Sequence, residues 1–145
     1  MNSFSQCIIT YDAAQTLVSA ALTYAQSRGW AVAVAVCDPH GGLVSFGRDD
    51  ATAPPIGGFA LDKAYTAATL RKPSAEFGAG MMKSATLSLG VGTRERLLTW
   101  GGGVPVYEQG ALIGAIGVSG AKEPEDVECA LAAIRDAGLS AAVEA

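Results

Sequence analysis

The segment AVAVAVC at residues 31–37 constrains the fold of this chain more than any other part of the sequence. Successive side chains of a β-strand point to opposite faces of the sheet, so valines would lie on one face here and alanines on the other. Both faces are apolar, which predicts a central strand covered on both sides. Because alanine is small, whatever covers the alanine face is expected to approach the strand closely.

A turn and a second strand follow this segment. DPHGG at 38–42 is rich in turn-forming residues, and LVSFGRD at 43–49 has the length and composition of a strand. Together with 31–37 these residues predict a β-hairpin.

Three more strands are predicted in the glycine-rich region nearer the C-terminus. They are RLLTW at 96–100, VPVY at 104–107 and ALIGAIGVS at 111–119, and EQG at 108–110 suits a turn between the last two. Pro105 has no backbone N–H to donate, so its strand is expected at an edge of the sheet or beside a bulge. Hairpins rather than β-α-β crossovers make the predicted sheet antiparallel.

Three helices are predicted to pack on this sheet. The first begins at the capping residue Thr10, continues with apolar residues at i, i+3, i+4 spacing, and is stopped by Gly29. The second runs from about residue 56 to residue 72, where Pro73 ends it. The third, at about 124–137, begins with a proline and acidic residues that suit the positive end of a helix.

Residues 74–93 lack a clear periodicity and are predicted to be mostly loop, with at most a short helical turn. A loop of this length in a small domain is more often functional than idle. We expect this loop or the helix beside it to lie near a subunit contact.

Composition supports such a contact. Half of the 145 residues are hydrophobic, and the mean hydropathy is +0.29. No uncharged apolar run approaches the roughly 20 residues that span a bilayer, so no membrane partner is expected. The excess of apolar residues predicts a homo-oligomer, either a dimer or a multiple of dimers. The chain length predicts one domain over residues 1–145.

Charge and cysteine content narrow the function classes further. The formal net charge is −4 and the basic residues are dispersed, which argues against nucleic-acid binding. The three cysteines are odd in number and widely spaced, which predicts reduced, buried thiols in a cytoplasmic protein. The first residues, MNSFSQCIIT, lack the basic start and long apolar stretch of a secretory signal.

Few side chains have an obvious chemical role. His40 is the only histidine, which argues against a Ser-His-Asp triad and a multi-histidine metal site, and no metal site is predicted. Lys63 lies on the apolar border of the second helix, where it either reaches up to solvent or points into a pocket as an anion contact or a perturbed amine. Asp62 and Glu76 are single carboxylates without a visible partner.

The glycines at 101–103 allow two interpretations. They do not form a phosphate loop, because no Lys-Ser or Lys-Thr pair follows them. They either make a structural bulge or turn, or expose backbone N–H groups to an anionic ligand, with Gly102 and Gly103 as the candidates. Phe77 and Tyr107 suit an apolar pocket wall, with core packing as the alternative.

Three segments together resemble one protein family. They are VAVCDPHGGLVSFGRDD at 34–50, ALDKAYTAATLRKPS at 60–74 and WGGGVPVYEQGALIGAIGVSGAKEPEDVECA at 100–130. The combination of GGG-x-P with GAIGVSG is similar to the GlcG/HbpS/PduO C-terminal family over essentially the whole chain. The resemblance implies a profilin-like α/β (α+β) fold, in which helices pack on a five-stranded antiparallel sheet. It also implies self-association and, for some members, haem or corrinoid-linked roles.

The first functional hypothesis is a small-ligand-binding domain. It would bind haem or another anionic, partly aromatic molecule at a pocket near a subunit interface. The segment after the second helix has no histidine, so an iron ligand would have to be His40 or a cysteine, methionine, tyrosine or hydroxyl group. The residues expected to bind the ligand are Arg48, Lys63, Arg71, Phe77, Gly102, Gly103 and Tyr107, with Arg94 or Arg96 as further anion contacts.

Two other hypotheses stay open. The chain could be a cofactor-independent isomerase or hydrolase that acts on a small carboxylate-bearing catabolic intermediate. Lys63 would then be the anion clamp or acid/base, and Glu76 or Asp62 the carboxylate base. Alternatively, the chain could be an accessory subunit of a catabolic enzyme without a ligand of its own.

Overall fold

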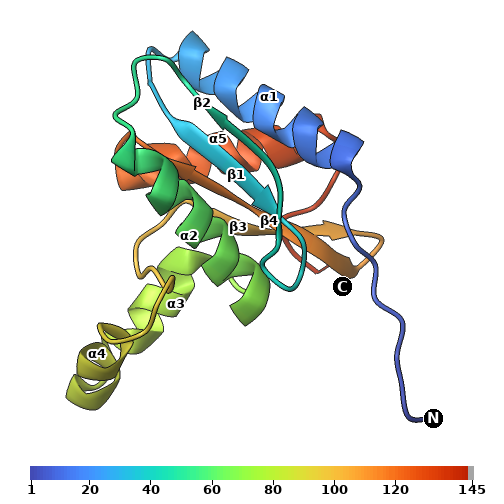
Figure 1. Ribbon diagram of the computed structural model, residues 1–145, viewed down its shortest axis with the longest axis vertical. Helices are drawn as coiled ribbons and strands as arrows, with labels where there is room; N and C mark the ends of the chain where they lie inside the picture. The colour runs from blue at the N-terminus through green and yellow to red at the C-terminus, as the bar shows by residue number, and fades with distance from the viewer. Residues whose placement is uncertain (144–145) are drawn as a thin grey trace.

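The computed structural model describes residues 1–143. In it a four-stranded antiparallel sheet lies between helices (Figure 1). The elements are α1 (Tyr11–Ser27), β1 (Ala33–Cys37), β2 (Leu43–Arg48), α2 (Pro55–Leu70), α3 (Ser74–Met81), α4 (Ala85–Val91), β3 (Gly103–Glu108), β4 (Ala111–Ser119) and α5 (Glu123–Asp136).

The strand order is β2-β1-β4-β3, and every neighbouring pair is antiparallel. Both predicted hairpins are confirmed, and they join in the middle of the sheet, where Val36 of β1 lies opposite Ile116 of β4. The turn of the second hairpin contains Gln109 and Gly110, both with positive φ. Pro105 lies on the edge strand β3, as its missing donor predicts.

The two faces of β1 are covered by different helices, as the alternation of valine and alanine predicts. The valine side packs in one core with α1 and α5, and the alanine side packs in a second core with α2 (Figure 1). On the alanine side the contact is close, because a Cβ atom added at Gly117 of β4 would overlap the α2 backbone at Ala60 and Ala64. Little more than backbone and methyl groups therefore separates α2 from the sheet.

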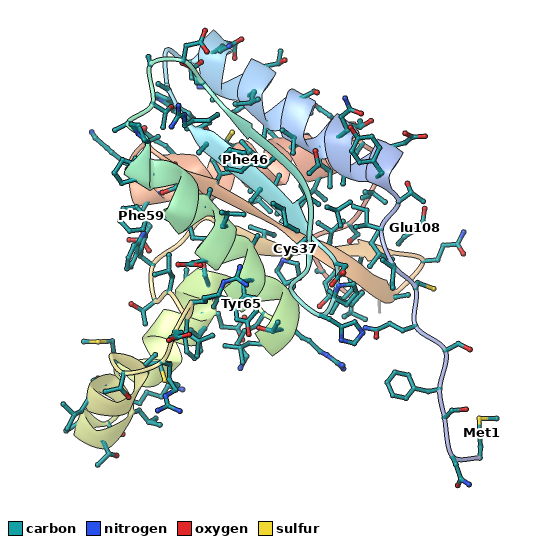
Figure 2. The ribbon with its side chains drawn as sticks, viewed as in Figure 1. Met1, Cys37, Phe46, Phe59, Tyr65 and Glu108 are labelled. Carbon is teal, nitrogen blue, oxygen red and sulfur yellow. The ribbon has the colours of Figure 1, made fainter. Side chains whose placement is uncertain are left out.

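The helix boundaries follow the predicted signals to within about two residues. Thr10 caps α1, and its Oγ1 accepts a hydrogen bond of 3.2 Å from the Ala13 amide. Gly29, with φ of 76°, follows the end of this helix. Ile9 is still buried in the core, and before it the chain extends away from the body, with Met1 at its tip (Figure 2).

The predicted strand at 96–100 is wrong, so the sheet has four strands rather than five. These residues belong to an irregular segment between α4 and β3, residues 92–102, which we call the strap. The peptide groups of residues 96, 98, 100 and 101 bond to side chains rather than to a neighbouring strand. The Leu98 amide donates to the Thr66 hydroxyl at 3.0 Å, and the Ser74 hydroxyl donates to the Trp100 carbonyl at 2.8 Å.

The prediction of a loop over residues 74–93 is also wrong, because most of this region forms α3 and α4. These two helices, which we call the arm (residues 74–91), project from one end of the sheet (Figure 1). Glycine at 78, 80 and 90 lowers the helix propensity of the arm and conceals its periodicity. None of the helices in residues 1–143 is long and apolar enough to cross a membrane.

All three cysteines are free, and the prediction that all are buried is wrong for Cys7, which is exposed. Burial raises the pKa of both Cys37 and Cys129 to about 12. Because the thiolate is the reactive form, we expect a thiol reagent at about pH 8 to modify one thiol per folded chain and all three in urea. The count can be read from intact mass. A second thiol that reacts as fast as Cys7 in the folded protein would contradict this prediction.

Candidate functional site

Lys63 is fully buried and joins the two helical layers. It extends from α2, and its Nζ donates to the Val118 carbonyl at 2.9 Å and to Oδ2 of Asp126 on α5 at 3.1 Å. Since α2 and α5 cover opposite faces of the sheet, the side chain passes the sheet edge beside Gly102, just before β3 begins. The Lys63 ammonium therefore links α2 to α5 through an ion pair and to β4 through a hydrogen bond.

Burial is the largest influence on the pKa values of Lys63 and Asp126. It lowers the pKa of Lys63 and raises the pKa of Asp126, while the attraction between the two charges acts in the opposite direction. The prediction that Lys63 reaches solvent is wrong, since its side chain is 1% exposed. It points inward instead, where its Nζ pairs with Asp126, and its role as an anion contact stays a prediction. In the sequence Asp126 is recognisable only as one of the acidic residues in the first turn of a helix.

The three glycines at 101–103 are buried around this lysine. The Gly101 amide donates to the Glu123 carboxylate, and the Gly103 amide donates to the Ser74 hydroxyl at 2.9 Å. Gly102 has φ of 125°, and an added Cβ would lie 2.8 Å from Lys63 Nζ. Two of the three amides are thus used within the chain, and the geometry favours the structural interpretation over an open anion site.

The other predicted site residues do not converge on Lys63. Arg48 is exposed on β2, the edge strand opposite β3, and Arg71 is exposed at the end of α2. Glu76 is exposed on α3. Tyr107 is buried on β3, where its backbone pairs with Ser140. Within one protomer these four side chains lie on four elements and do not form a common pocket with the lysine.

The strap lies along α2 on the side away from the sheet. Arg96 stacks over the Tyr65 ring, with its guanidinium carbon 4.1 Å from the ring centroid, and its Nε lies 3.2 Å from Oδ1 of Asp62. The Trp100 ring meets Phe59 edge to face at 5.8 Å between centroids, and Phe59 points outward from α2 (Figure 2). These contacts hold the strap against α2.

An apolar groove of about 370 Å³ lies between the arm and the strap. The strap contributes Thr93 and Arg94 to its lining, and Arg94 is exposed. Gly90 of α4 leaves open space where a side chain would stand. The apolar side chains that line the groove are Phe77, Met81, Leu87, Val91 and Leu97. Phe77 is therefore the predicted ligand-binding residue that the structure places in an apolar cleft beside a cation.

Comparison with known proteins shows similarity over most of the chain. The family model described as haem degrading protein HbpS-like matches residues 9–135. Protein GlcG of Escherichia coli K12 is 33% identical over 115 residues, which cover 79% of this chain and 84% of that protein.

Two solved structures have the same fold. The Klebsiella pneumoniae protein ORFY has a TM-score of 0.86 at 28% identity and covers 95% of this chain and 97% of its own. A PduOC–haem complex has a TM-score of 0.83 at 25% identity, with coverage of 92% and 98%. The chain belongs to the HbpS-like family, as the resemblance of its hairpins and glycine-rich segment implies.

Proposed function

We propose that this chain binds haem, or another flat, anionic and largely apolar small molecule, in the groove between the arm and the strap. The observation that carries the proposal is the groove itself, which combines apolar walls with the exposed cation of Arg94. Ligand sites commonly consist of an apolar cleft with a few polar groups that orient the ligand. The structure of a related protein, PduOC, contains haem, which makes a tetrapyrrole the first ligand to test.

The groove fits part of a tetrapyrrole. Its volume of about 370 Å³ lies near the lower end of the roughly 300–1,000 Å³ range of small-molecule sites. An added Cβ at Gly90 would meet nothing within 4 Å, so a flat ligand can approach the α4 backbone there. Arg94 would pair with a carboxylate of the ligand, while the rest of the macrocycle edge stays open to solvent or to a second subunit.

The iron ligands within reach of the groove are weak. Met81 lines it and offers a thioether, whereas His40 does not line it. Cys37 and Cys129 are buried thiols of raised pKa, so neither supplies a thiolate. Bound haem would supply a redox-active iron. This chain's own residues would hold the macrocycle by apolar contact and one ion pair, so that affinity would depend little on the metal.

A haem titration followed by absorbance tests the proposal. We expect a saturable Soret shift and, for iron-free protoporphyrin followed by fluorescence, a dissociation constant within about threefold of that for haem. Gly90→Leu fills the open space in the groove and should weaken the binding of both haem and protoporphyrin by at least about tenfold. Gly58→Leu is the matched control, because Gly58 also has open space but lies on α2. The absence of a saturable shift, or equal affinity in the Gly90 variant, would reject the groove as the site.

The enzyme hypothesis receives less support from the geometry. Lys63 Nζ is held by Val118 and Asp126 and is closed off from solvent, and Glu76 stands exposed on a different element. The accessory-subunit hypothesis stays a prediction.

We also propose that the chain acts as a homo-oligomer and that it is located in the cytoplasm. The three free thiols support the cytoplasmic location.

A further inference from the structure

We propose that a second cavity, at the opposite end of α2 from the arm, binds a small carboxylate with a short apolar body. The α1–β1, β2–α2 and β4–α5 connections meet at this end of the sheet (Figure 1). Between them lies a cavity of about 450 Å³, lined by residues 29–31, 51–53 and 120–121 and by Ile56 at the start of α2. It shares no lining residue with the groove, so this inference goes beyond the proposed function and does not depend on it.

The hydroxyl group of Thr52 is the first observation that points to a ligand. Thr52 lines the cavity and is 6% exposed. Among residues 1–143, its Oγ1 is the one buried side-chain nitrogen or oxygen without a hydrogen-bond partner. A buried polar group without a partner costs free energy that an apolar group of the same shape avoids. Since rotation about χ1 can present this hydroxyl to the cavity, we take a ligand there as its missing partner.

The walls of the cavity also contain backbone donors that the chain does not use. In the part of the chain that the structure describes, the amides of Ala31, Ala53 and Gly120 donate no hydrogen bond to another residue. Each of these residues belongs to a different connection, so the cavity has donors from all three. Because hydroxyl and amide groups donate, a ligand that satisfies several of them has to present an acceptor, such as the oxygens of a carboxylate.

The charge near the cavity favours an anionic acceptor. α2 begins beside the cavity with no acidic residue in its first turn and no capping side chain, so the positive end of its dipole is not neutralised there. Lys122 and Asp50 adjoin the lining residues and are both exposed, so their charges offset one another. The helix end therefore decides the sign of the charge that the cavity prefers.

Hydrogen bonds around the cavity hold its walls in place. The Asp49 carboxylate accepts from the Ala51 amide, and the Asp49 carbonyl accepts from the Thr52 amide, both at 2.9 Å. On the other side the Asp126 carboxylate accepts from the Ala121 amide at 3.0 Å. Both carboxylates are thus engaged by the walls themselves, and a ligand would enter a largely preformed site.

Trp30 and Ile56 form the apolar part of the lining, and both are half-buried. Two side chains of α1 hold the Trp30 ring. Tyr24 meets it edge to face at 6.3 Å between centroids, and the guanidinium carbon of Arg28 lies 5.9 Å from its centroid. The cavity volume lies in the lower part of the roughly 300–1,000 Å³ range of small-molecule sites, so the apolar body of the ligand is short.

A titration with sodium benzoate, followed by proton–nitrogen correlation NMR, tests the site. We expect saturable shifts of the Ala31, Ala53 and Gly120 amide signals with a dissociation constant at or below about 1 mM. The neutral analogue benzamide should bind at least about tenfold more weakly, because it lacks the charge. No saturable shift with benzoate, shifts confined to other segments, or equal affinity for benzamide would overturn the proposal.

Thr52→Val separates a ligand contact from a structural role, because it removes the hydroxyl and keeps the shape. The variant should melt no lower than the wild type but bind benzoate at least about tenfold more weakly. The control is the same substitution at Thr66, whose buried hydroxyl contacts the Asp62 and Arg96 carbonyls and accepts from the Leu98 amide. Thr66→Val should melt at a lower temperature and bind benzoate like the wild type. Unchanged benzoate affinity in Thr52→Val, or a melting temperature lowered as much as in Thr66→Val, would show that the Thr52 hydroxyl is not the ligand contact.

Discussion

Replacing Lys63 with methionine is expected to lower the free energy of unfolding by about 3–5 kcal/mol, because it leaves the buried Asp126 carboxylate without its cation. Asp126 is 2% exposed and would keep only the Ala121 amide, which donates to its Oδ1 at 3.0 Å. Typical domains have a total stability of about 5–15 kcal/mol, so the loss would be a large share. Urea denaturation followed by circular dichroism measures it.

The control is Arg96→Met, which removes the exposed ion pair with Asp62 together with the stacking on Tyr65. That pair has a similar separation, 3.2 Å, but its side chains are 44% and 31% exposed, so its loss should cost less than about 1 kcal/mol. The double variant Lys63→Met with Asp126→Leu should recover most of the loss, because neither charge then stays buried alone. If Lys63→Met and Arg96→Met are equally stable, the buried ion pair does not hold the two helical layers together.

The free energy of unfolding of Lys63→Met should also depend on pH, and the direction of this dependence follows from the pKa of Asp126. Burial already raises the pKa of Asp126 in the folded state, and removing Lys63 removes the largest opposing effect. A carboxyl group whose pKa is raised by folding contributes most stability below its unfolded pKa of about 4, and this contribution is lost as pH rises through the folded pKa. The gap between Lys63→Met and the wild type should therefore be smaller at pH 5 than at pH 8.

Gly117→Ala is expected to destabilise the fold by about 3 kcal/mol, at the upper end for overpacking. Its added methyl group would overlap the backbone of α2 at Ala60 and Ala64. Side chains can rotate away from a new atom, but here the whole helix would have to shift. Thermal unfolding of the variant measures the loss.

The control for this substitution is Gly58→Ala, on α2 itself, where an added Cβ meets nothing within 4 Å. It should stabilise the protein by about 0.5–1 kcal/mol through helix propensity. Similar melting temperatures for the two alanine variants would contradict the close contact between α2 and β4.

The sequence predicts those parts of the fold that depend on local pattern. The alternation at 31–37, the turns of both hairpins and the cap at Thr10 each involve neighbouring residues, and all are confirmed. The strap could not be predicted in this way, because its amides and carbonyls bond to Thr66 and Ser74, which lie far from it in sequence. A run such as RLLTW has the composition of a strand whether or not a neighbouring strand is there to pair with it.

In the candidate site, too, the sequence predicts what depends on neighbouring residues but not what depends on distant ones. A cation on an apolar helix border is unusual, so the sequence points to Lys63, but its partner Asp126 is 63 residues away and has a sufficient local explanation as a first-turn acid. Phe77 was predicted to line an apolar wall, yet the groove required two helices that the glycines of the arm conceal. Arg48, Arg71 and Tyr107 are distinguished in the sequence mainly by residue type, and the fold places them on β2, at the end of α2 and on β3.

The strand order also bears on how the chain reaches this structure. Each hairpin pairs residues that are neighbours in sequence, whereas β1 and β4 meet only after α2, the arm and the strap have been traversed. Closing so long a loop costs entropy before any contact is gained, and non-local pairing of this kind slows folding. We therefore expect the rate of folding to depend more on how readily residues 49–102 collapse against the first hairpin than on the strand propensity of either hairpin.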